Sequence, residues 1–451
     1  MPLKTPHTTS KVCFMNQRSI FYTASFFGIL TAGFLSFFSV NTNYMLSDPY
    51  GTLATSEVLI SHGTIKLDAS GIDLSGYDYR VHQKNGHYYY YFPIGTPVFI
   101  APIIATLKLA NVDIAHNEIE IQKAISVLTS MITVWLMTYL ASFFIKKPLA
   151  PLFATVFWLG STLSSTNGVA LWSHNFAVIF GLVGVIYSVR MTLAPRRGDW
   201  AIIGLSIFLA YLARPTMSLF GVFLVCFLLI QQRKCAIKVI ALLVALLGLF
   251  VAFSEHEFLQ PLPDYYLPGR VAQGAEERSL EGVLFSPSRG LFIFMPFLIV
   301  SFIAAFRSSG DNSWPFGKSW LLIGLLWPLA HLLLVASFQP WTGGWCFGPR
   351  LSTDAMPGLF LLTLHALPQH LENLSNRLIA FVLAITLAFS MAVHVRQGMF
   401  NKWTWAWNRD VSETWDWSYP QFLASEEGFI RYLQKKHPDS PTLRYLKNHR
   451  L

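Results

Sequence analysis

A long polar stretch separates the first apolar segment of this chain from all the others. The first apolar segment covers residues 21–40, and a polar stretch from Ser47 to Pro93 follows before further apolar segments begin. Connections between neighbouring helices are usually short. A connection of this length, rich in acids and tyrosines, has room for structure of its own, and long loops often carry functional residues.

The composition places the chain in a membrane. Hydrophobic residues make up 53% of the sequence and charged residues only 13%, whereas soluble proteins carry about 25% charged residues. Membrane-spanning helices need about 20 apolar residues each. We therefore expect an all-α polytopic membrane protein with about eleven transmembrane helices, over residues 19–41, 120–145, 149–166, 174–193, 200–213, 216–231, 236–253, 290–306, 319–338, 351–368 and 377–395.

The basic residues predict the orientation of these helices. A net charge of +9 also suits nucleic-acid binding, but the basic residues stand in short clusters between apolar segments, such as Lys146–Lys147, Arg196–Arg197 and Arg233–Lys234. Such clusters are typical of cytoplasmic loops. We expect a multi-pass protein of the plasma (inner) membrane with a cytoplasmic N-terminus, surrounded by membrane lipids and binding no nucleic acid.

The same pattern predicts two parts of the chain. Residues 1–395 form a transmembrane domain whose first outer loop covers 42–119, and 396–451 form a short segment on the outer face. Within the loop, residues 93–110 are apolar but contain three prolines, so we expect an interfacial or re-entrant helix here.

Asp48, just beyond the first span, has two interpretations. Asp followed by Pro49 is typical of a helix start with Asp as N-cap, and such a helix would end at Gly63. A carboxylate at the membrane surface is also able to accept a substrate proton. Asp48 is therefore a candidate catalytic base as well as a candidate cap.

Three arginines lie at the mouths of predicted spans: Arg214, Arg289 and Arg350. A guanidinium is a planar, permanently charged fork that suits phosphate, and the alternative is an arginine that reaches the lipid headgroups. Arg350 follows a Gly/Trp-rich loop, residues 341–349, that leaves it little freedom to reach them. This favours phosphate binding for Arg350 and leaves both interpretations open for Arg214 and Arg289.

Five further residues are candidates for contact with a sugar: Glu57, His87, Tyr89, His174 and Trp345. Tyr89 lies in an aromatic run that equally suits an interfacial belt. For Glu57 a solvated position in the loop is favoured, and His174 also suits an interfacial position. The histidines lack metal-ligand spacing, and no glycine-rich phosphate loop follows a strand. We expect no metal site and no nucleotide cofactor.

Together these features resemble the GT-C superfamily of membrane glycosyltransferases, which includes the protein O-mannosyltransferases and the aminoarabinose transferase of lipid A. The resemblance rests on the acid after the first span, the long first outer loop, the Tyr-Tyr-Phe-Pro-Ile-Gly sequence at 90–95, the Arg214–Pro215 hairpin and the loop before Arg350. It covers most of the chain.

The resemblance implies a sugar donor linked to polyprenyl phosphate and a glycan, lipid or protein acceptor. It assigns Asp48 as the base and Arg350 as a donor-phosphate ligand. The chain departs from the family's pattern in two places, because Asp48 is followed by Pro49 instead of a second acid and residues 165–175 contain no acid. Asp48 is left as the main acid, and a divalent metal is left open.

Two other functions share some of these features. A lipid-linked sugar flippase or transporter would carry paired broken helices and acids within its spans, whereas the acids of this chain concentrate in predicted loops. A polymerase or ligase of surface glycans would use the same kind of lipid-linked donor.

Overall fold

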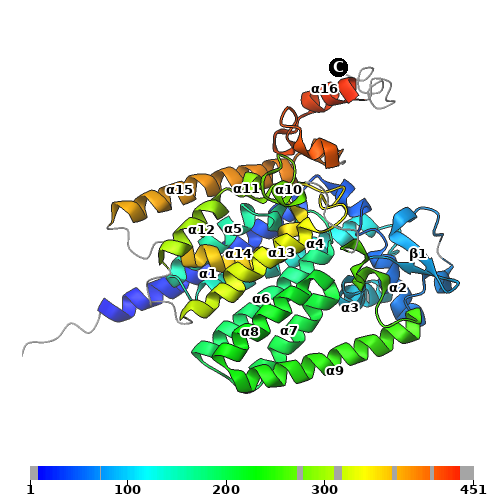
Figure 1. Ribbon diagram of the computed structural model, residues 1–451, viewed down its shortest axis with the longest axis horizontal. Coiled ribbons are helices and arrows are strands. Elements are labelled where there is room, and N and C mark those ends of the chain that lie inside the picture. Colours follow the sequence, from blue (N-terminus) through cyan, green and yellow to red (C-terminus); the bar gives the residue numbers. More distant parts are fainter. Residues whose placement is uncertain are drawn as a thin grey trace, which may run out of the picture.

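The computed structural model is about 74% helical (Figure 1). It describes residues 9–71, 73–271, 278–308, 317–367, 373–406 and 411–436. The α-helices are α1 (Thr9–Phe38), α2 (Thr52–His62), α3 (Gly95–Leu109), α4 (Glu118–Ala141), α5 (Ala150–Leu159), α6 (Ser173–Leu193), α7 (Asp199–Ala213), α8 (Ser218–Gln231), α9 (Arg233–Phe258), α10 (Ser279–Phe285), α11 (Leu291–Phe294), α12 (Phe297–Ser308), α13 (Trp327–Ala336), α14 (Met356–Ala366), α15 (Leu374–Met391) and α16 (Glu426–Lys436). One antiparallel pair of strands, β1 (Val81–Lys84) and β2 (His87–Tyr90), is present in the described ranges.

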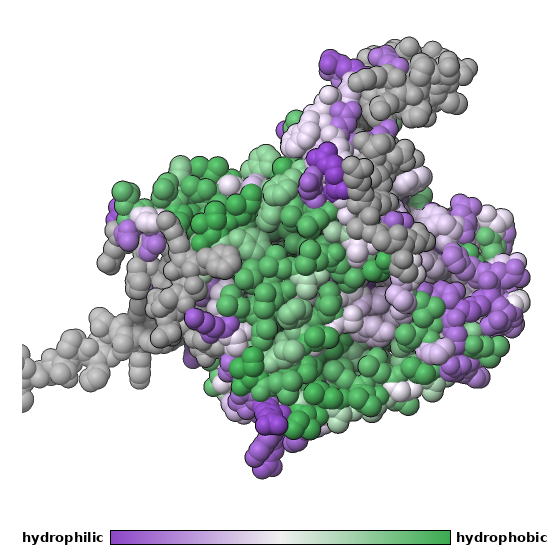
Figure 2. Space-filling view, viewed as in Figure 1, coloured by the Kyte–Doolittle hydropathy of each residue, from purple (hydrophilic) through white to green (hydrophobic). Residues whose placement is uncertain are grey.

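The helices confirm the all-α membrane class. Each of the eleven predicted ranges contains helix, and five helices are long and apolar enough to cross a membrane: Gln17–Phe38, Glu118–Ala141, Ser173–Leu193, Arg233–Phe258 and Leu374–Met399. Shorter apolar helices occupy Gly95–Leu109, Lys147–Leu159, Asp199–Ala213, Pro215–Gln231 and Leu322–Ala336. Figure 2 shows apolar residues covering the helical body and polar residues gathered over the first outer loop. The number of crossings stays a prediction.

Small residues allow the helices to approach closely. A side chain at Gly33 of α1 would meet Met131 of α4, and one at Gly184 of α6 would meet Phe220 of α8. Such close approach is how membrane helices gain packing energy, since lipid is as apolar as the helix surface. These closely packed helices form the body that carries the connecting loops.

The first outer loop folds into α2, the β1–β2 hairpin and α3. Asn85 and Gly86 both have positive φ (52° and 81°), as a two-residue hairpin turn of the kind formed by Asn-Gly requires. This hairpin was not predicted. The helix predicted over 93–110 is present as α3, and its placement at the membrane surface stays a prediction.

The prediction that Asp48 caps a helix was wrong. Helix α2 begins at Thr52, and its N-cap is Gly51 with φ 105°. A side chain at Gly51 would press on the rings of Tyr90 and Tyr77, so the chain turns tightly here and starts its helix late. The predicted end of this helix is confirmed at Gly63, which has φ 68°.

The chain after α15 returns to the helical body. Gln421 is fully buried there and is hydrogen-bonded to the backbone of Cys346 and Gly348. The predicted boundary at residue 395 stays a prediction, and residues 437–451 of the predicted outer-face segment lie outside the described part.

Candidate active site

A polar cavity of about 220 Å³ lies where the first outer loop meets the connection between α13 and α14. Its lining residues come from five separate places in the sequence: Ser47 and Asp48; Tyr79, Arg80 and Phe92; Arg214; Tyr265; and Phe338, Gln339, Pro340, Gly343, Gly344, Trp345, Arg350 and Leu351. The lining therefore carries three arginines and one aspartate, an excess of positive charge that favours an anionic ligand.

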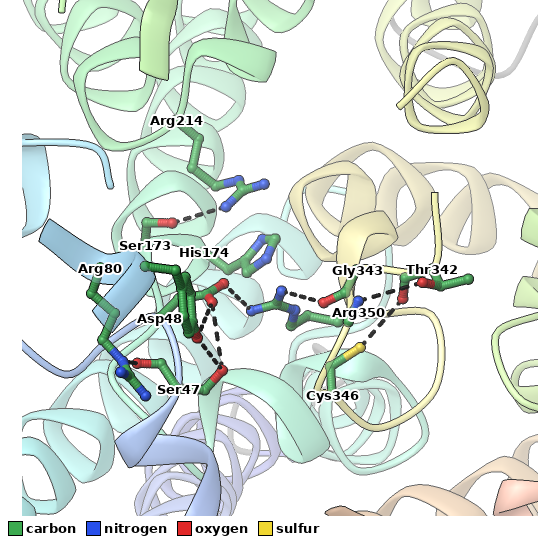
Figure 3. Close-up of polar contacts among 12 residues, drawn as sticks. Ser47, Asp48, Arg80, Ser173, His174, Arg214, Thr342, Gly343, Cys346 and Arg350 are labelled. Atoms are coloured by element: carbon green, nitrogen blue, oxygen red, sulfur yellow. Dashed lines mark hydrogen bonds and ion pairs between the residues drawn. The ribbon is translucent and has the colours of Figure 1, made fainter. Parts of the chain in front are cut away.

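Asp48 and Arg350 form an ion pair on the wall of this cavity (Figure 3). Arg350 Nη1 donates to Asp48 Oδ2 over 2.8 Å, and Arg350 Nη2 donates to the carbonyl of Gly343 over 2.7 Å. The guanidinium also lies 4.0 Å from the centroid of the Trp172 ring. The Arg350 side chain is 8% exposed and that of Asp48 is 24% exposed, so water and a ligand reach the carboxylate more easily than the guanidinium.

This pairing fixes the charge of Arg350. Burial alone would lower the pKa of the guanidinium, but its pairing with Asp48, together with Cys346 and Tyr265, raises the pKa above its ordinary value. Arg350 is therefore a permanent cation in the cavity.

The outer loop holds Asp48 in place through its backbone. Arg80 Nε donates to the carbonyl of Ser47 over 2.8 Å, and Tyr90 donates its hydroxyl to the carbonyl of Asp48. Tyr79 donates to Asp48 Oδ1 over 3.3 Å. Burial and then the charge of Asp48 raise the pKa of Tyr79, so its hydroxyl stays a donor. One oxygen of Asp48 thus faces Tyr79 while the other faces Arg350.

A second set of contacts shapes the loop that carries Arg350. Gly343, Gly344 and Gly348 all have positive φ, a conformation that glycine adopts without steric cost. The buried amide of Gln421 accepts from the Gly348 N–H over 2.9 Å and from Arg289 Nη1 over 2.6 Å. The loop is therefore fastened to the chain that follows α15.

Arg289 takes part in that fastening. Its Nε donates to the carbonyl of Thr342 over 3.0 Å, and its side chain is buried outside the cavity lining. The structure thus gives Arg289 carbonyl and amide acceptors around the loop. Of the two interpretations left open for Arg289, phosphate contact in this cavity has no support in the geometry.

Arg214 belongs to a buried cluster that sequence reasoning missed. Its Nε donates to Asp354 Oδ2 over 2.6 Å, and its Nη1 donates to the hydroxyl of Ser173 over 2.9 Å. Asp354 also accepts from His174 Nδ1 over 2.6 Å and from Thr216 over 2.9 Å. The centre of the cluster, Asp354, is fully buried.

Asp354 also corrects an expectation. It falls inside the predicted span 351–368, so the acids of this chain do not all lie in loops. In the structure it lies in a short 3₁₀ helix, Arg350–Ala355, that leads from the Gly/Trp-rich loop into α14. A lone acid in an apolar span is a signal of function, and this signal would have found it.

The remaining candidates lie in different places. Trp345 lines the cavity. His174 lies behind Arg214, outside the lining. Glu57 pairs with Lys108 over 2.8 Å, which joins α2 to α3. His87 pairs with Asp68 over 2.8 Å, and Tyr89 donates to the carbonyl of Glu257 over 2.6 Å, so the structure places these three away from the cavity.

The sequence predicted no metal site. Within the part of the chain that the structure describes, no three His, Cys, Asp or Glu side chains come together as a group able to hold a metal ion. The charged side chains that line the cavity are those of Asp48, Arg80, Arg214 and Arg350.

The fold and the cavity define a helical membrane protein with a charged pocket suited to an anion. Residues 121–404 match the model of the EpsG family, which is more than half of the chain. The chain therefore belongs to the EpsG family, a membrane family associated with glycosyl transfer or glycan polymerisation. The matched segment contains Arg214, Arg350 and Asp354 and begins after Asp48. No curated protein matches the chain.

Proposed function

We propose that this protein transfers a sugar from a polyprenyl-phosphate donor to an acceptor on the outer face of the membrane. The observation that carries the proposal is the Asp48–Arg350 pair on the wall of the cavity. It combines a carboxylate able to take a proton with a cation able to hold a phosphate. The EpsG family match supports a glycosyl-transferring membrane protein in general terms, and a GT-C-like fold is part of this proposal.

The two charges suggest how the reaction proceeds. The donor phosphate competes with Asp48 for the guanidinium of Arg350, and its binding frees the carboxylate. Asp48 then removes the proton from the acceptor hydroxyl, whose oxygen bonds to the anomeric carbon of the sugar. The bond between that carbon and the phosphate oxygen breaks, and the phosphate leaves with its lipid. Arg350 stabilises the negative charge that develops on the leaving oxygen.

The uncharged residues of the cavity also suit a lipid-linked sugar. Phe338, Pro340, Trp345 and Leu351 add apolar surface to the lining of the cavity. Ligand sites that combine apolar walls with a few placed polar groups bind and orient their ligands. Trp345 is 46% exposed, and we propose that its ring contacts the sugar or the first part of the lipid.

A second candidate function is polymerisation of a surface glycan. The EpsG family match favours it, because the family is associated with polymerisation as well as with glycosyl transfer. In that reaction the acceptor is itself a lipid-linked glycan, and the chemistry at Asp48 and Arg350 is unchanged. The two functions differ in product length and not in the site.

Mass spectrometry of surface glycans tests both functions. Cells without the gene are compared with cells that carry the wild-type protein or its Asp48→Asn variant. Transfer of a single sugar predicts that the deletion and the variant both lack one residue per acceptor, whereas polymerisation predicts that long chains collapse to single repeat units. Identical glycans in all three strains would contradict the proposal.

The orientation has its own test. We propose that the first outer loop faces outward and that the α6–α7 connection faces the cytoplasm, because the latter carries Arg196 and Arg197. In a chain whose four native cysteines are replaced by serine, Ser75→Cys should react with a membrane-impermeant thiol reagent in intact cells. Arg197→Cys, which is equally exposed, should react only after the cells are opened. Reaction of Arg197→Cys in intact cells would reverse the orientation.

A further inference from the structure

The arginine that reaches the cavity from the α7–α8 connection is held by a carboxylate outside it. Arg214 lines both this cavity and a smaller pocket that Asp48, Trp172 and Ser173 also line. Its side chain is 7% exposed and that of Asp354 is fully buried. Asp354 therefore touches no ligand in the cavity, and it acts only through Arg214.

The contacts of Arg214 leave one edge of its guanidinium for a ligand. Nε is bound to Asp354 and Nη1 to Ser173, while no described residue accepts from Nη2. Figure 3 shows the Nη1 contact with Ser173, and Arg214 above the Asp48–Arg350 pair. Binding an anion at Nη2 breaks no existing contact, whereas Arg350 must first release Asp48.

We propose that Asp354 is a positioning residue that holds Arg214 as a second ligand for the phosphate of the lipid donor. This inference rests on the proposed function and deepens it. A guanidinium fixed at two of its three nitrogens loses little freedom when the third binds an anion. Arg214 therefore captures the phosphate first, and the phosphate then draws Arg350 away from Asp48.

His174 and Thr216 complete this arrangement from the other side. Both donate to Asp354 and so stabilise its carboxylate without reaching the cavity. The Asp354–His174 contact resembles the pairing that orients a histidine base. However, His174 Nε2 is buried and His174 lines neither the cavity nor the smaller pocket, so the geometry assigns His174 to support of Asp354.

Binding of a lipid phosphate without a sugar tests this role apart from catalysis. The purified full chain is titrated with a short-chain polyprenyl monophosphate and with the matching prenyl alcohol, and tryptophan fluorescence reports binding. The wild-type protein should prefer the phosphate. Asp354→Asn and Arg214→Gln should each weaken phosphate binding about tenfold or more, as expected for loss of a hydrogen bond to a charged group. Binding of the prenyl alcohol should not change. A variant whose structure is merely damaged would lose binding of the alcohol as well.

A double variant guards against misfolding. Each single variant leaves a buried charge without its partner, which is destabilising, whereas Asp354→Asn with Arg214→Gln removes both charges together. Asp264→Asn is the matched control, because Asp264 pairs with Lys84 in the outer region and should bind phosphate normally. A folded double variant that still prefers the phosphate as strongly as the wild-type protein would overturn the inference. So would a phosphate preference that is lost on substitution of Arg350 but not on substitution of Arg214 or Asp354. Equal binding of phosphate and alcohol by the wild-type protein would instead count against the proposed function.

Discussion

Asp48→Asn is expected to lower the rate of sugar transfer by about 10²–10⁴-fold, the usual contribution of a general base. The amide keeps the size of the side chain and its ability to accept from Tyr79, but it cannot take a proton from the acceptor. Because α2 begins at Thr52 and Gly51 is its N-cap, the substitution removes no helix cap. The measurement is the transfer rate with purified protein and a lipid-linked donor.

Asp48 is also the counter-ion of Arg350, so a loss of activity has two possible causes. A double-mutant comparison separates them. If Asp48 only holds Arg350, then Asp48→Asn should cost nothing more in an Arg350→Ala background, where no cation remains to be held; if Asp48 is the base, Asp48→Asn should still lower the residual rate steeply. Asp73→Asn is the matched control, since Asp73 is an exposed acid of the same loop that contacts Ser75. Near-normal transfer by folded Asp48→Asn protein would move the chemistry elsewhere.

Arg350→Ala is expected to weaken donor binding about 10- to 100-fold through the lost charged hydrogen bonds. It should also lower turnover, because the leaving phosphate loses a stabilising cation. Arg350→Lys should restore part of both, since lysine keeps the charge and lacks the planar fork. Transfer rate measured against donor concentration separates the two effects.

The stability of the Arg350 variants must be measured together with their activity. Arg350 also lies on the Trp172 ring and bonds to Gly343, so alanine removes packing as well as charge. Thermal unfolding of each variant should be compared with Arg431→Ala, which removes an exposed arginine of α16. Unchanged donor affinity and turnover in folded Arg350→Ala protein would make Arg350 a structural residue.

Local sequence was sufficient for the helices and insufficient for the pairing of residues. Apolar runs and prolines place the helical segments, because each helix is stabilised by residues close to it in the chain. The Asn85–Gly86 pair also carries a local hairpin signal, which was overlooked among the polar residues of the loop. Asp48 and Arg350 were each identified as candidates, but they are 302 residues apart and only the packing of α4, α6 and the outer loop brings them together.

The three candidate arginines also show that local sequence does not predict which residues pair. Arg214, Arg289 and Arg350 occupy similar positions at the mouths of predicted spans, yet one pairs with Asp354, one with Gln421 and backbone carbonyls, and one with Asp48. The side-chain partners Asp354, Gln421 and Asp48 are each more than 100 residues from their arginines, so no local pattern distinguishes the three arginines. Asp354 was not predicted as a site residue for a different reason: its neighbours in the sequence are apolar, so it fell within the predicted span 351–368.

The hydrogen bonds that Gln421 makes with Cys346 and Gly348 affect the order in which the candidate site is assembled during synthesis. Asp48 leaves the ribosome early, Arg350 much later, and Gln421, which fastens the loop before Arg350, close to the end of the chain. A nascent chain that has inserted all its earlier helices therefore still lacks a fixed partner for Asp48. We therefore expect the Asp48–Arg350 pair of the candidate site to become fixed only after the segment around Gln421 has docked on the helical body.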